Sequence, residues 1–130
     1  VVYSHAEQRI HFIDLHRSTQ DDYVQDVSVF LVSNFRIPVF NPSLRFRLNW
    51  LNAGMFRFAR DFALKKKDAA FHARLALALA RSFYTSTRFE LNTTFAKNMY
   101  LRSHFLLDRL VAHKGVPWED FVFPVEVLYY

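Results

Sequence analysis

The stretch LRFRLNWLNAGMFRFARDF, from Leu44 to Phe62, decides the fold of this 130-residue chain. Arginine alternates with apolar residues at both of its ends, as it would in a strand, but the alternation is short. Over the whole stretch, large apolar residues recur at intervals of 4, 3, 4, 3 and 4, which is the period of one helix face. The sequence therefore predicts a helix whose stripe faces the core. The stripe consists of Leu44, Leu48, Leu51, Met55, Phe58 and Phe62.

Local signals place the start of this helix and of a second one. Asn41 is a helix cap and Pro42 suits the first helical position, so the first helix is expected over residues 42–66. Asp68 is a candidate cap for a second helix, over residues 69–84. The core face expected for the second helix is Phe71, Leu75, Leu79 and Phe83.

A third helix is expected over residues 88–113, followed by an extended tail. Thr87 and Glu90 have the spacing of a capping box. Gly115 and the proline two residues later favour a stop. The core face expected for this helix is Phe95, Met99, Leu106 and Leu110. The tail, residues 115–130, is rich in aromatic residues and valine, so we expect it to lie across this protein or across a partner.

The N-terminal region, residues 1–40, is expected to be extended. Residues 9–15 and residues 23–33 are rich in β-branched or alternating apolar residues and are strand candidates. A short amphipathic helix beginning near Ser18 is the competing interpretation, because STQD resembles a capping box.

The predicted fold class is mainly α: a three-helix antiparallel bundle with a short extended N-terminal segment and an extended aromatic C-terminal tail. An α+β domain with a small sheet is the alternative. The length fits a single domain over residues 1–130, with a helical core at 41–114.

Composition excludes several chemistries. Cysteine is absent, which rules out disulfides, thiolate catalysis and cysteine-based metal sites. No apolar run approaches the roughly 20 residues that span a bilayer. Gly54 interrupts the first helix, and close approach of a neighbouring backbone would explain it. The chain begins at Val1, and both a removed leader and a start within a longer product remain open.

Charge is distributed unevenly along the chain. Residues 36–109 hold fourteen Lys or Arg against four acidic residues, whereas both flanking segments are net acidic. Such a block favours an anionic partner, namely RNA, an acidic protein face or an anionic lipid such as cardiolipin. The alternative is that the acidic ends fold over the basic middle. The candidate anion contacts are Arg45, Arg47, Arg57, Arg60, Lys65, Lys66 and Lys67.

Catalytic and metal-binding patterns are weak, and no catalytic, cofactor or metal residue is predicted. His11 and His16 would point to opposite faces of a strand, so they do not readily share a metal with Asp14. The two isolated glycines cannot form a phosphate-binding loop. A third hypothesis is a small enzyme with a cleft that holds two or more of His11, Asp14, His16 and His104.

Apolar residues outside the helix stripes point to a protein partner. A helix that is apolar on two sides is either central in a core or covered by another chain, and a domain of this size centres few helices. The alternative is one overfilled core. The expected partner-binding residues are Phe46, Trp50, Leu64, Leu101, Phe105, Trp118, Phe121 and Phe123.

These observations predict a non-catalytic accessory subunit of a large mitochondrial assembly, with a respiratory-chain complex or ATP synthase favoured. The expected location is the matrix side of the inner membrane, where anionic lipid would meet the basic block. The alternative is a structural protein of the mitochondrial ribosome that binds RNA.

Overall fold

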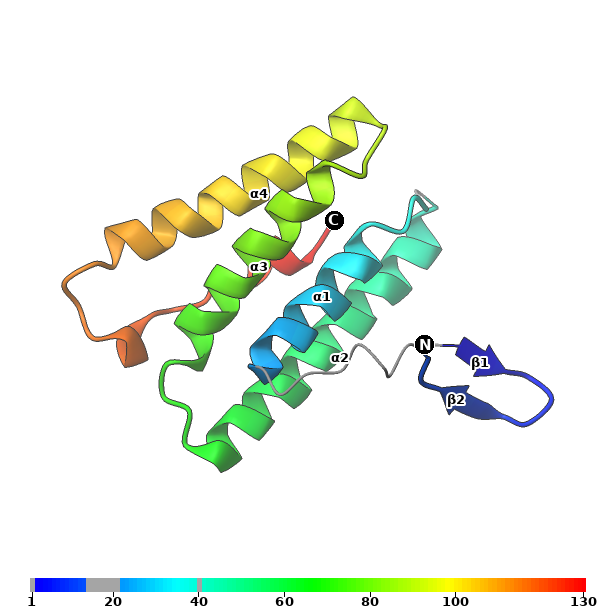
Figure 1. The fold of residues 1–130 in the computed structure, drawn as a ribbon, viewed down its shortest axis with the longest axis horizontal. Coiled ribbons are helices and arrows are strands. Elements are labelled where there is room, and N and C mark those ends of the chain that lie inside the picture. Colours follow the sequence, from blue (N-terminus) through cyan, green and yellow to red (C-terminus); the bar gives the residue numbers. More distant parts are fainter. Residues whose placement is uncertain (1, 14–21, 40) are drawn as a thin grey trace.

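The computed structural model describes residues 2–13, 22–39 and 41–130, and these residues are mainly helical, as predicted (Figure 1). A hairpin of two short antiparallel strands, in which Tyr3 pairs with Ile10, precedes the helices. The described residues form four helices rather than three, and successive helices alternate in direction. The elements are β1 (Val2–Ser4), β2 (Arg9–His11), α1 (Tyr23–Phe35), α2 (Pro42–Lys66), α3 (Phe71–Thr87), α4 (Thr93–Ala112) and two 3-10 turns, η2 (Trp118–Asp120) and η3 (Val125–Leu128).

The additional helix, α1, corrects the expectation of a strand over residues 23–33, whereas β2 lies within the other strand candidate, residues 9–15. Asp22 caps α1, since its Oδ1 accepts a hydrogen bond from the Val24 amide at 3.0 Å. The buried residues of α1 recur at helical spacing, and packing against them outweighs the strand preference of β-branched residues. They are Val24, Val27, Ser28, Leu31, Val32 and Phe35. The helix interpretation is therefore correct, although its proposed start at Ser18 lies outside the described residues.

Helix α2 has the predicted bounds, but it buries a different face. Asn41 caps it, accepting hydrogen bonds from the amides of Ser43 and Leu44. The expected stripe lies about a quarter-turn from the face that packs, so the prediction that it faces the core is wrong. The residues that α2 buries are Arg45, Asn52, Phe56, Ala59 and Ala63.

Polar bonding and small side chains explain this rotation of α2. Asn52 donates to the backbone carbonyl of Leu128 at 3.3 Å and accepts from Asn34 at 3.1 Å, so its burial satisfies its amide group. Alanine at positions 59 and 63 lets neighbouring segments approach closely. A count of large apolar residues detects neither effect.

Helix α3 lies between α1 and α4, and its expected core face is confirmed. Two of the expected caps are wrong. Thr87 belongs to the last turn of α3, where its hydroxyl donates to the carbonyl of Tyr84, and the cap of α4 is Asn92, which accepts from the amide of Phe95 at 3.0 Å. The N-cap position of α3 is occupied by Ala70 rather than by Asp68, and Ala70 makes no side-chain capping hydrogen bond.

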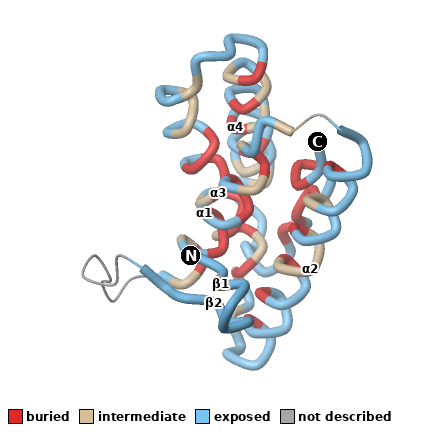
Figure 2. Tube along the Cα trace, turned by 90° about the vertical axis from the view of Figure 1, so that its right-hand side faces the viewer, coloured by how far each residue is buried: buried red, intermediate tan, exposed pale blue. Residues whose placement is uncertain are grey.

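The tail returns from the end of α4 across the chain's own core. Gly115 turns it with φ of 94°, a conformation that suits glycine. The turns η2 and η3 interrupt the expected extended backbone. Phe121 and Phe123 are only 3% and 4% exposed. Figure 2 shows that buried positions cluster where α1, α3 and α4 meet, whereas α2 lies at the edge with its outer side exposed.

Candidate functional site

No metal-binding cluster forms among the described residues. Groups of three or more His, Asp or Glu that could hold a metal are absent from them. His11 Nε2 lies 2.7 Å from Glu7 Oε2 on the hairpin, whereas the His104 ring lies tilted against the Tyr100 ring on α4. Figure 1 places these elements at opposite ends of the molecule. Asp14 and His16 lie outside the described residues, so the cleft hypothesis gains no support.

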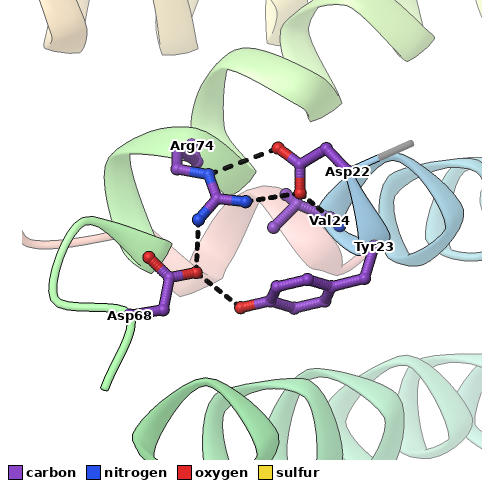
Figure 3. A network of polar contacts seen from close by, with 5 residues as sticks. All are labelled: Asp22, Tyr23, Val24, Asp68 and Arg74. Atoms are coloured by element: carbon purple, nitrogen blue, oxygen red, sulfur yellow. Dashed lines mark hydrogen bonds and ion pairs between the residues drawn. The ribbon is translucent and has the colours of Figure 1, made fainter. Parts of the chain in front are cut away.

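One polar network joins three segments of the fold, and Figure 3 shows it from close by. The Arg74 guanidinium donates to Asp68 Oδ2 at 2.5 Å and to both carboxylate oxygens of Asp22. The Tyr23 hydroxyl donates to the same Asp68 oxygen at 2.6 Å. An open depression of about 590 Å³ lies beside these groups. The network connects the start of α1, the α2–α3 turn and the first turns of α3.

The contacts of this network shift the pKa values of Tyr23 and Arg74. Burial and the hydrogen bond to Asp68 raise the pKa of Tyr23 well above its ordinary value. Burial acts to lower the pKa of Arg74, but the bonds and charges of Asp22 and Asp68 outweigh it and raise that pKa. Tyr23 and Arg74 therefore both keep their protons at neutral pH.

Two arginines hold the tail rather than facing solvent. Arg45 is buried, donates to the carbonyls of Phe35 and Ile37, and lies 4.5 Å from the centre of the Tyr130 ring. Arg102 donates to the Val127 carbonyl at 2.8 Å. Burial lowers the pKa of both guanidinium groups, and Tyr130 offsets part of that shift. Arg45 is therefore an internal support, which corrects its assignment as an anion contact.

The other candidate anion contacts lie at the surface of α2 or just after it. All six are exposed: Arg47, Arg57, Arg60, Lys65, Lys66 and Lys67. They are spread around the exposed part of the helix and do not form one compact patch. The lysines sit at its C-terminal end, where positive charge complements the helix dipole.

The predicted partner-binding residues divide into two groups. Phe121 and Phe123 pack inside the chain's own core, so they cannot contact a partner. Phe46, Trp50 and Leu64 are 71%, 65% and 71% exposed. The remaining predicted residues are also exposed: Leu101, Phe105 and Trp118.

The structure adds further apolar residues to the outer side of α2. Because the helix buries a different face, most of its stripe remains in solvent. We call the resulting surface the α2 outward face: Leu44, Phe46, Trp50, Leu51, Phe58, Phe62 and Leu64, all exposed. Seven large apolar side chains on one helix surface are more than scattered surface residues would explain.

A second apolar feature, the α4 groove, lies between α4 and the tail. It has a volume of about 270 Å³ and is lined by Asn98, Leu101, Arg102, Phe105, Glu126 and Val127. Leu101 and Phe105 were predicted as partner-binding residues because they lie outside the expected core face of their helix. Glu126 and Val127 were not predicted, because only the folded tail brings them beside α4.

Known proteins provide no assignment for either surface. Comparison of the chain with protein-family models, with curated proteins and with solved structures finds no match. No helix in the described part of the chain is long and apolar enough to cross a membrane.

Proposed function

We propose that this chain is a non-catalytic accessory subunit of a larger protein assembly. The α2 outward face is the observation that carries the proposal. Each apolar side chain of this size contributes roughly 1.5–3 kcal/mol when it is fully buried, so covering the face with protein is strongly favourable. The α4 groove offers a second contact surface on a different helix.

The proposed assembly is mitochondrial, on the matrix side of the inner membrane, with a respiratory-chain complex or ATP synthase favoured. The support for this location is the basic, arginine-rich composition, with a formal net charge of +5. The exposed lysines that end α2 could contact anionic lipid such as cardiolipin. Fractionation of organelles, followed by carbonate extraction of the inner membrane, would test the location.

The test of the function is purification of the tagged chain from its native cells under mild conditions. We expect it to elute at the mass of a multi-protein complex with partners in fixed ratio. Leu101→Glu would place a charge in the α4 groove and should release those partners. Lys97→Glu, an exposed change elsewhere on α4, is the matched control and should not. A chain that elutes alone as a folded monomer would contradict the proposal.

RNA binding is the second candidate, and the six exposed cations on α2 and just after it favour it. A contact with phosphates weakens steeply as salt rises, because counterions are released on binding. We expect RNA affinity to fall by orders of magnitude between low and physiological salt if this candidate is correct. A flat response, or absence of binding at low salt, would remove it.

A further inference from the structure

Complementary groups lie within and beside the α2 outward face, placed symmetrically about Gly54. Arg47 lies seven residues before Gly54 and Asp61 lies seven residues after it. Trp50 lies four residues before it and Phe58 four residues after it. Arg47, Asp61, Trp50 and Phe58 are all exposed.

We propose that this face binds α2 of a second copy of the chain, antiparallel, with a twofold axis beside Gly54. Residues equally far from the axis, on opposite sides of it, then lie at the same height on the two helices. Arg47 of one copy therefore faces Asp61 of the other, and Trp50 faces Phe58. The symmetry provides each of these contacts twice.

Gly54 fits this arrangement better than it fits the isolated chain. Glycine weakens a helix relative to alanine. A Cβ built at Gly54 would meet nothing within 4 Å, so the fold of one chain does not require glycine there. Beside a twofold axis the two backbones come closest at this position, and a larger side chain would hold them apart.

The charge pattern selects the direction of the second helix. A parallel pair would place the Arg47 residues of the two chains beside each other, and likewise the two Asp61 residues. These contacts between like charges are repulsive. Among the residues that the structure describes, Asp61 pairs with the adjacent Arg60, at 3.2 Å and largely in solvent. Such an exposed pair is weak, so the carboxylate is available to Arg47 of the second copy.

This inference rests on the proposed function, because it names the occupant of one of the two apolar surfaces. The α4 groove remains open to other subunits when two copies are joined through α2. The twofold pair would thus be a core to which different proteins attach.

The absence of cysteine makes single-cysteine variants a direct test of the register. Gly54→Cys places both thiols at the axis, where the Cα separation is close to the roughly 4.4–6.8 Å that a disulfide needs. Ser43 and Lys65 lie eleven residues from Gly54, on opposite sides of it. Copies of Ser43→Cys would be about 33 Å apart in height and should not cross-link with each other.

We expect Gly54→Cys to form disulfide dimers on mild oxidation. Ser43→Cys and Lys65→Cys should form a disulfide only when the two variants are mixed. This second pair keeps glycine at position 54, so it tests the register even if a side chain there weakens the dimer. Self-cross-linking of Ser43→Cys would indicate a parallel pair and would overturn the proposal. So would the absence of cross-linking in every variant and mixture.

Charge reversal tests the Arg47–Asp61 contact by sedimentation over a range of concentrations. Arg47→Glu should raise the dimer dissociation constant at least roughly tenfold, since it opposes two carboxylates. Combining it with Asp61→Arg should restore the dimer, whereas Lys97→Glu should leave the dissociation constant unchanged. A double variant no tighter than Arg47→Glu alone would contradict the proposed register.

The two proposals fail in different ways. If the chain shows none of these cross-links but co-elutes with other proteins through the α4 groove, the dimer is wrong and the accessory-subunit function stands. If it cross-links as described but elutes from cells only with itself, the dimer stands and the accessory-subunit function is wrong.

Discussion

Helices α3 and α2 are both rich in apolar residues, but the rest of the chain covers them very differently. α3 lies between α1 and α4 and buries Phe71, Leu75, Leu79 and Phe83. α2 is longer, yet most of what it buries is small or polar, and its larger apolar residues remain outside. A helical stripe therefore predicts that a face will be covered, but not which chain covers it. The following changes test this contrast.

The largest effect is expected in the middle of α3. Leu79 is 0% exposed, so Leu79→Ala removes buried methyl groups and leaves a cavity. We expect the free energy of unfolding to fall by about 2–5 kcal/mol. Urea unfolding at low protein concentration measures it. A loss below about 1 kcal/mol would mean that α3 is not the centre of the core.

The polar network beside α3 should contribute less, and its contribution should depend on pH. Tyr23→Phe removes the bond to Asp68, at an expected cost of about 1 kcal/mol at neutral pH. The pKa of Tyr23 is raised above its ordinary 10.0, so its stabilising contribution is complete below that pH. It is lost as pH rises toward the raised value, because the unfolded chain releases the proton first.

Urea unfolding of the wild type and Tyr23→Phe on both sides of pH 10 measures this dependence. The wild type should lose more stability than the variant as the pH rises. Tyr84→Phe, at an exposed tyrosine of α3, is the matched control. If the free energy of unfolding fell equally with rising pH in the wild type and in Tyr23→Phe, the Tyr23 hydroxyl would not be held by Asp68.

On α2, a change that stabilises one chain should weaken the pairing of two. Gly54→Ala should raise the stability of the monomer by up to about 1 kcal/mol, because alanine is the better helix former and the site has room for it. The same change should weaken the twofold pair. Unfolding at low concentration and sedimentation at high concentration separate the two effects, and tighter association of Gly54→Ala would contradict the role given to Gly54.

The smallest effect is expected on the outer side of α2. Leu64→Ala makes the same chemical change as Leu79→Ala, but Leu64 is largely in solvent. We expect the free energy of unfolding of the monomer to change by at most about 0.5 kcal/mol. A loss that matches the one at Leu79 would show that the chain itself covers this face.

The sequence predicted best where a structure depends on adjacent residues. Asn41 and Pro42 start α2 as expected, because a cap acts through amides two and three residues away. The cap at Thr87 failed because Asn92, a few residues later, offers the same chemistry. At α1, packing overrode β-branched preference, which local propensity does not include.

The burial of Arg45 and Asn52 could not be predicted from the sequence, for a different reason. Arg45 looks like any other arginine of α2, but it is inside because the carbonyls of Phe35, at the end of α1, and of Ile37, in the following loop, lie beside it together with the Tyr130 ring. Asn52 is inside because the tail returns to accept its hydrogen bond. These partners come together only in the folded chain. They also determine which face of α2 packs against the core, and most of the apolar stripe is therefore exposed to solvent.

Solvent labelling of Trp50 tests most directly whether other protein covers the α2 outward face. The labelling rate of Trp50 in the natively purified chain is compared with its rate in the diluted monomer, and each is divided by the rate in the unfolded chain. Leu91, which is 96% exposed, is the internal reference. We expect strong protection of Trp50 in the native state, lost on dilution, with Leu91 labelled equally in both. Equal labelling of Trp50 in the two states would contradict a covered face.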